Sequence, residues 1–265
     1  MHDYVEGSPP PRLATHVSCW CVHRVETGSS SYLHRSAPTG SVEFVCEVGA
    51  RPLLVGPQTG PFVRTLPSGS TTVSIRLRPE SAAAVLGVPG YELTDRIVAL
   101  EDVLPATRFL GERIAGEPER AVAALEATVG TQVGRDTAID RSVAFAVGRL
   151  AGQRPRVSSV AASLFVSERE LRRRLKVAVG LSPKKLERIL RFQRFLALVH
   201  IGGCRTPGLA RSAVALGYAD QAHLTRECVR LSGVPPAELI RQTDRHCRGR
   251  HDHSPSFHSL FRGTA

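Results

Sequence analysis

The carboxyl-terminal half of the sequence contains a run of cationic side chains at helical spacing. In a helix over Glu168–Lys176, Leu171 and Leu175 lie four residues apart and can both face a hydrophobic core. Ser167 precedes them and is a preferred helix N-cap. The outward face then carries Arg169, Arg172, Arg173 and Lys176. Arginine can pair bidentately with guanine O6 and N7 in a DNA major groove, which discriminates between bases by roughly 1–3 kcal/mol per pair.

A second segment, Asp220–Arg230, repeats this pattern with more amide chemistry. Leu224 and Cys228 take the inward positions. Glutamine can pair bidentately with adenine, and the flanking polar face contains Gln221, Ala222, His223, Thr225 and Arg226. Each segment follows a short apolar stretch and a turn, Val157–Ser167 and Pro207–Tyr218. We therefore predict two helix-turn-helix units whose recognition helices cover about 167–177 and 220–230.

A single long helix is predicted between the two units. Ser182 is its N-cap and Pro183 occupies the favoured first helical position. Its apolar residues recur at helical spacing, at Leu186, Ile189, Leu190, Phe192, Phe195, Leu196 and Val199. Such a helix would hold the two recognition helices at a fixed separation.

This arrangement resembles the DNA-binding domain of the AraC/XylS family of bacterial transcription regulators. The resemblance rests on spaced motifs over roughly a hundred residues: Val160-Ala161, Leu171-x-Arg173, Gly180–Pro183, Arg191-x-x-Arg194, Ala215–Tyr218, Asp220-Gln221, Leu224–Arg226 and Gly233–Pro236. Ser212 and Cys228 depart from it, since the family usually has isoleucine and phenylalanine there. These departures predict looser packing in the second unit.

The resemblance implies roles for the polar residues. Base contacts are expected from Arg169, Arg172, Arg173, Gln221, Ala222, His223 and Arg226. Phosphate contacts are expected from Lys176, Arg191, Arg194 and Thr225. Helix packing is the alternative role for Lys176, Arg191 and Arg194, and a structural or backbone role is the alternative for Arg173 and Arg226. Most charge runs are simply solvated helix faces, but the second unit and its turns argue against that reading here.

The net charge of +11 is concentrated in the carboxyl-terminal half. Between Arg141 and Arg250 there are 22 Arg or Lys against seven Asp or Glu, whereas the rest of the chain has 13 against 17. A basic domain joined to a mildly acidic one is typical of a phosphate-binding domain beside a domain with another task. Double-stranded DNA is therefore the predicted partner.

The amino-terminal half shows short alternating segments with Gly and Pro turns, of which Thr71–Arg78 is the clearest strand. We predict an α+β chain with a β-rich, barrel-like amino-terminal domain with appended helices, one of them from Pro105 to Ile114, and an all-α double helix-turn-helix domain. The predicted boundaries are a disordered lead over 1–12, the β-rich domain over 13–130, a linker over 131–139, the DNA-binding domain over 140–246 and a disordered tail over 247–265.

Motifs in the amino-terminal half are similar to the cupin-like domain that accompanies some AraC-type regulators. They include Pro38-x-Gly40, Val55–Pro57, Arg76–Pro89 and Leu93–Asp95. What this implies is a sensing or dimerising module. Its expected partners are a small-molecule effector, a second copy of the chain and, for an activator, RNA polymerase.

An alternative function uses the cysteines. Cys19, Cys21 and Cys46 could form a metal- or thiol-based redox sensor, although packing in a core is the more common role of such residues. The histidines and Cys247 of the tail could also bind a metal. Two further alternatives are a cupin-like metal enzyme and an architectural DNA binder without an effector.

No catalytic motif was found, so we predict a protein that is not an enzyme, without a cofactor or a metal site. The first residues lack the features of a signal peptide, and no apolar run is long enough to span a membrane. The predicted location is cytoplasmic.

Overall fold

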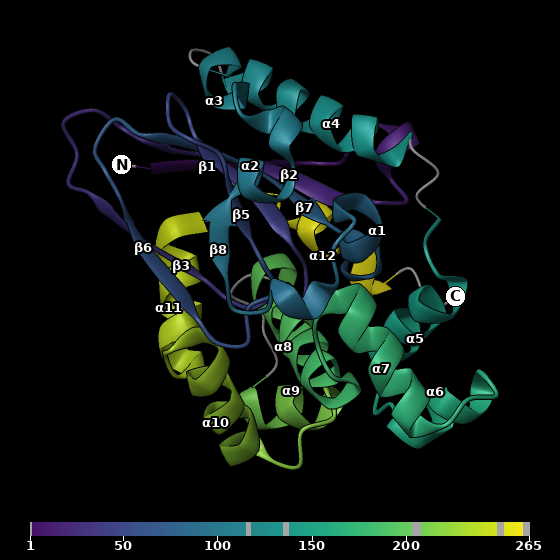
Figure 1. Ribbon diagram of the computed structural model, residues 1–265. Helices are drawn as coiled ribbons and strands as arrows, with labels where there is room; N and C mark the ends of the chain where they lie inside the picture. Colours follow the sequence, from purple (N-terminus) through teal and green to yellow (C-terminus); the bar gives the residue numbers. More distant parts are fainter. Residues whose placement is uncertain (1, 115–117, 135–137, 203–207, 248–251, 262–265) are drawn as a thin grey trace.

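The computed structural model describes residues 2–114, 118–134, 138–202, 208–247 and 252–261, and all structural statements below refer to these residues. Strands come first along the chain and helices dominate after residue 100 (Figure 1). The predicted α+β class is confirmed. The β-rich part is an open sheet, because its edge strands β1 and β8 do not pair with each other.

One sheet has six strands, and a separate two-stranded ribbon lies beside it. The order in the sheet is β1 (His2–Gly7), β2 (Val17–Val25), β7 (Thr71–Leu77), β4 (Glu43–Glu47), β5 (Leu53–Val55) and β8 (Ile97–Ala99). The ribbon consists of β3 (Tyr32–Ser36) and β6 (Phe62–Leu66). All these pairs are antiparallel.

Alternation along the strands gives the six-stranded sheet two different faces. Val22, Phe44 and Ile75 lie in a hydrophobic core that includes residues of α1 (Ala82–Leu86) and α4 (Pro118–Val133). Helix α4 lies across this face of the sheet (Figure 1). The opposite face is more polar and is turned toward the helices of the carboxyl-terminal part.

Short helical segments connect the sheet to α4. They are η1 (Pro11–Leu13), η2 (Pro79–Ser81), η3 (Gly90–Glu92), α2 (Leu100–Val103), η4 (Pro105–Thr107) and α3 (Leu110–Arg113). The single helix predicted from Pro105 to Ile114 is wrong. The chain breaks between η4 and α3, because Phe109 has φ −98° and ψ 13°, outside the helical region.

Within the described residues, seven helices form the carboxyl-terminal part up to residue 247. They are α5 (Arg141–Leu150), α6 (Val157–Ser163), α7 (Glu168–Val179), α8 (Pro183–Gly202), α9 (Leu209–Ala215), α10 (Gln221–Ser232) and α11 (Pro236–Cys247). All seven apolar residues predicted for the inner face of α8 are buried. The two helix-turn-helix units, α6–α7 and α9–α10, lie on either side of α8 (Figure 1).

Three predicted boundaries are wrong. The lead is not disordered, because residues 2–7 form β1 and pair with β2. The linker does not begin at 131, because α4 continues to Val133. The tail forms α12 (Ser254–Phe261), where the backbone N–H of Ser256 donates to Glu6 Oε2 at 3.0 Å and Phe257 is buried. Distant partners stabilise the first and last segments, so neither carries a strong local signal.

Candidate nucleic-acid interface

Helix α7 is capped at both ends. The Ser167 hydroxyl accepts a hydrogen bond from Glu170 N at 3.1 Å, and Gly180 ends the helix in the left-handed conformation at φ 87°. Leu171 and Leu175 are buried, as predicted. The four cations named above, Arg169, Arg172, Arg173 and Lys176, are all exposed on the other face.

An acidic residue holds two of the arginines on α7. Glu170 accepts two hydrogen bonds from Arg173, both at 2.8 Å, and one from Arg174 at 2.8 Å. The hydrogen bonds from Arg173 and then from Arg174 lower the pKa of Glu170 to about 2. No described carboxylate lies within 4.0 Å of the guanidinium groups of Arg169 or Arg172, so neither cation is held in an ion pair among the described residues.

Helix α10 is built in the same way. The Asp220 carboxylate accepts from His223 N at 2.6 Å, and Gly233 ends the helix at φ 79°. Leu224 and Cys228 are buried, as predicted. Burial raises the pKa of the Cys228 thiol to about 11.

The polar residues of α10 differ in how freely they can meet a ligand. Gln221, Ala222 and Arg226 are exposed, whereas His223 is half-buried and its Nδ1 accepts from Ala219 N at 3.3 Å. The Thr225 hydroxyl donates to Gln221 O at 2.9 Å, so its proton is already used within the helix. The predicted donation from Thr225 to a DNA phosphate would require this hydrogen bond to break.

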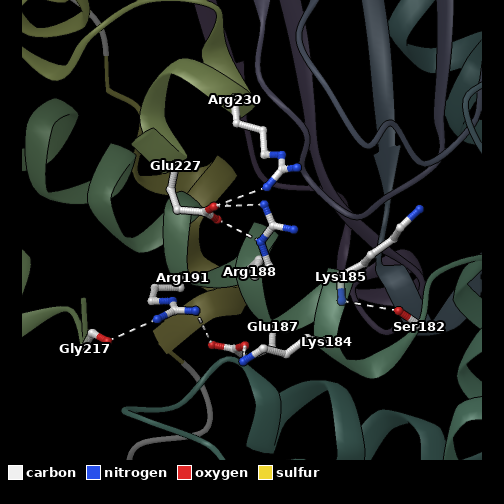
Figure 2. Close-up of polar contacts among 9 residues, drawn as sticks. All are labelled: Ser182, Lys184, Lys185, Glu187, Arg188, Arg191, Gly217, Glu227 and Arg230. Atoms are coloured by element: carbon white, nitrogen blue, oxygen red, sulfur yellow. Dashed lines mark hydrogen bonds and ion pairs between the residues drawn. The ribbon is translucent and has the colours of Figure 1, made fainter. Parts of the chain in front are cut away.

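Polar contacts connect helix α8 to the second unit (Figure 2). Arg188 donates to both carboxylate oxygens of Glu227 on α10, at 2.8 and 3.0 Å. Arg191 pairs with Glu187 at 2.8 Å and donates to Gly217 O at 3.0 Å, with its guanidinium 4.9 Å from the centre of the Tyr218 ring. These contacts fix α10 and the second turn on α8.

Arg191 and Arg194 therefore lie inside the domain. The Arg191 side chain is only 15% exposed, and Arg194 donates to Gly152 O at 3.0 Å. Of the two roles that the sequence left open for them, phosphate contact and helix packing, the geometry supports packing.

The turns of the two units have the same backbone hydrogen bond. Val166 N donates to Ala161 O in the first turn, and Tyr218 N donates to Ala213 O in the second. Equivalent positions are therefore Phe165, with φ 54°, and Gly217, with φ 82°. Left-handed geometry costs a bulky residue on the order of 1–2 kcal/mol, which glycine avoids.

Phe165 is also 97% exposed, and our sequence reasoning did not single it out. The sequence does contain a signal for Phe165, in the comparison of the two turns. Aligning Leu164-Phe165-Val166 with Leu216-Gly217-Tyr218 shows an aromatic residue where the second turn has glycine.

The three cysteines proposed as a sensor do not lie together. Cys21 pairs with Ser74 and Cys46 with Val73, so they lie on opposite faces of the sheet. Cys19 shares the face of Cys21, and a hydrogen bond from Cys21 lowers the pKa of Cys19. The three-cysteine site is therefore wrong.

Among the described residues, no group of three or more His, Cys, Asp or Glu is placed to hold a metal ion. Most of the tail histidines, Cys204 and the side chain of Cys247 lie outside what the structure describes.

A cavity of about 540 Å³ lies between the polar face of the sheet and the carboxyl-terminal helices. Its walls include His34, Arg64 and Arg76 from the strands, and Gln193 and Gln242 from α8 and α11. Arg76 pairs with Glu43 at 2.8 Å, whereas no described carboxylate lies within 4.0 Å of the Arg64 guanidinium. Both halves of the molecule thus line one space large enough for a small molecule.

In the comparison with known proteins, each half of the chain matches a family model. Residues 160–242 match the model of a helix-turn-helix domain, which spans both predicted units. The chain carries an AraC-type helix-turn-helix domain. Residues 5–99 match a domain of unknown function, DUF6597. The protein is thus a DNA-binding transcription regulator.

Several solved structures of ToxT from Vibrio cholerae are similar to this chain. ToxT from strain O395 is 11% identical with a TM-score of 0.43, covering 92% of this chain and 97% of that chain. Its complex with (E)-4-(8-methylnaphthalen-1-yl)but-3-enoic acid is 11% identical with a TM-score of 0.44, covering 92% and 98%. Wild-type ToxT bound to an unsaturated fatty acid is 11% identical with a TM-score of 0.41, covering 91% and 94%.

None of the curated proteins matches the chain. Within the described residues, no helix combines the length and apolar character needed to cross a membrane.

Proposed function

We propose that this regulator reads a bipartite DNA site by inserting α7 and α10 into successive major grooves on one side of the duplex. One observation carries the proposal. Both helices have a side-chain N-cap, a buried apolar face, a left-handed glycine at the end and an exposed polar face. Helix α8 packs in one hydrophobic core with both recognition helices and is tied to α10 by the Arg188–Glu227 ion pair, which favours a fixed separation of α7 and α10.

The residues have distinct roles in this docking. Arg169 and Arg172 read bases in the first groove, and Arg173 joins them when it leaves Glu170. Lys176 contacts phosphate and adds affinity without reading sequence. In the second groove, base edges are read by Gln221, Ala222, His223 and Arg226.

Paired substitutions test this docking. The DNA probe is a duplex that the wild-type protein selects from fragmented DNA of its own source. Arg172→Ala should relax specificity in one block of the site, and Gln221→Ala in the other, each by roughly 1–3 kcal/mol. Arg120→Ala, which removes an exposed charge from α4, is the control and should change neither block. If both Arg172→Ala and Gln221→Ala left affinity and specificity unchanged, the docking would be wrong.

The second part of the proposal is that the amino-terminal domain sets the geometry of the two recognition helices. Its Thr94 hydroxyl donates to Gly180 O, at the end of α7, at 2.9 Å. Its Arg35 donates to Ser232 O, at the end of α10, at 3.1 Å. The amide of Gln193, in the middle of α8, donates to Pro38 O at 2.6 Å.

These contacts favour a domain that holds both recognition helices by their carboxyl-terminal turns. The backbones of Gly90 and Gly180 approach so closely that a Cβ on Gly90 would lie 2.5 Å from Gly180 N. Neither glycine can therefore be replaced without separating the domains. The amino-terminal turns of α7 and α10, which would enter DNA, are left exposed.

A small-molecule effector in the cavity would act on this connection directly. The β3–β6 ribbon forms one cavity wall, and Arg35 lies in the same strand as His34. Breaking the contact by Arg35→Ala should lower affinity for the complete site several-fold, because α10 loses part of its pre-organisation. Affinity for each isolated half-site should not change. Equal losses on complete and half-sites would contradict this role.

A further inference from the structure

Phe165 stands out among the exposed large hydrophobic residues of the described chain. Its side chain is 97% exposed, although its neighbours Leu164 and Val166 pack against the helical core. The backbone therefore directs one aromatic ring of the turn into solvent while anchoring the residues on both sides.

Neither stability nor the geometry of the turn accounts for this ring. The backbone at Phe165 has φ 54°, a conformation that suits glycine, and the equivalent turn of the second unit has Gly217 there. An exposed ring gains nothing from burial to offset this strain. Strained positions of this kind are concentrated where a ligand is held.

The surroundings of Phe165 favour one ligand. Two residues further on, Ser167 caps the helix that presents Arg169 and Arg172. In helix-turn-helix proteins the start of the recognition helix meets base edges while the preceding helix crosses the backbone. The connecting turn thus lies at the edge of the groove, where duplex DNA offers thymine methyl groups and the carbon atoms of deoxyribose.

We propose that Phe165 is a DNA contact of the first unit, packing against thymine methyl or deoxyribose at the groove edge. This inference rests on the proposed docking of α7. It adds an apolar contact that the second unit lacks, because Gly217 has no side chain. The space beside Gly217 is also taken, since a Cβ added there would lie only 3.1 Å from Arg154 Cγ.

The test compares Phe165→Gly with wild type on the duplex that the wild-type protein selects from fragmented DNA of its own source. Affinity should fall about tenfold, whereas thermal stability should be equal or higher because glycine relieves the turn. The dependence of log affinity on log salt should keep its slope, because no cation is lost. Lys176→Ala is the matched contrast, since it should reduce that slope by about one.

Two controls separate the possible failures. Phe109→Ala removes another exposed aromatic ring, 63% exposed and located in the amino-terminal domain, and should leave DNA affinity unchanged. An unchanged affinity for Phe165→Gly would overturn the inference, even if transcription fell, since Phe165 would then contact a protein. If the wild-type protein selects no defined duplex, the proposed docking itself fails.

Discussion

The two helix-turn-helix units share one plan but are attached differently to the rest of the molecule. The second turn is held from several sides, with Gly217 O bonded to Arg191 and Tyr218 buried beneath the same guanidinium. The first turn exposes Phe165 and, among the described residues, has no comparable ion pair from α8. The comparison shows that a repeated motif can be fixed by packing in one copy and left open for a ligand in the other.

The two recognition helices also differ in their cores. Leu175 and Cys228 occupy equivalent buried positions, eight residues after the N-caps, and the smaller thiol lies 3.6 Å from the Ser232 hydroxyl. Ser212 is buried as well. The second unit thus has less apolar volume in its core and more ion pairing, and the following predictions test this contrast.

The largest effect is expected from Arg191→Ala. The substitution leaves the buried Glu187 carboxylate with only Lys184 and removes the bond to the second turn. Breaking a buried pair in this way should lower the free energy of unfolding by about 3–5 kcal/mol in urea titrations. Arg173→Ala, which breaks an exposed pair in the first unit, should cost less than about 1 kcal/mol. Similar losses for the two variants would refute the contrast.

Truncating the equivalent core residues should show the opposite asymmetry. Leu175→Ala removes a fully buried side chain and should destabilise the protein by about 2–5 kcal/mol. Cys228→Ala removes only a sulfur atom, so the expected loss is about 1 kcal/mol. Thermal unfolding of both variants checks the order, and a larger loss for Cys228→Ala would show that the second core is the tighter one.

Acid should loosen the packing of α8 against α12, where the His200 ring meets His253 and Phe257, before it affects the first unit. Burial, followed by the nearby His253, lowers the pKa of His200 from 6.5 to about 4, whereas residues 140–182 contain no histidine. Between pH 4 and 6.5, His200 is therefore protonated more in the unfolded chain than in the folded one. The contribution of neutral His200 to the free energy of unfolding is fully present above pH 6.5 and is lost as the pH falls toward 4. The expected loss is about 3 kcal/mol.

Hydrogen exchange locates this effect. Amides of α12 should lose protection as the pH falls, after correction for the intrinsic pH dependence of exchange, whereas amides of α6 and α7 should change less. His200→Phe should flatten the dependence, and an unaltered pH profile in that variant would assign it to another group.

The smallest effect is expected at the pair on α7. Glu170→Gln removes the carboxylate that holds Arg173, so this guanidinium becomes free to meet DNA. Affinity should rise slightly at low salt, and the salt slope should steepen by up to about one. Binding titrations at several salt concentrations measure both changes. A weaker complex would mean that Glu170 orients Arg173 for binding.

Local rules predicted most of the carboxyl-terminal domain. Leu171, Leu175, Leu224 and Cys228 are buried where helical spacing placed them, and Ser167 caps its helix. These features depend on residues within one or two turns of each other, so the sequence alone carries the information.

The errors arise where distant partners decide the outcome. Strand β1 is formed by pairing with β2, and α12 is held by a contact between opposite ends of the chain, in which Glu6 accepts from Ser256 N. The sequence left the role of Arg194 open, because its hydrogen bond to Gly152 O joins residues 42 positions apart, which no local pattern reveals. Phe165 was missed for another reason. Hydrophobic spacing gives no information on an exposed residue in a turn, and only the alignment of the two turns distinguishes Phe165 from Gly217.

Genome-wide footprinting of the purified protein at near-physiological salt tests the central claim most directly. Two helices held apart by α8 predict sharp sites with two short conserved blocks about one helical turn apart. In Arg172→Ala one block should lose definition while the other is retained. Diffuse binding that disappears with a modest increase in salt would show that only phosphate contacts are present, and would contradict the bipartite docking.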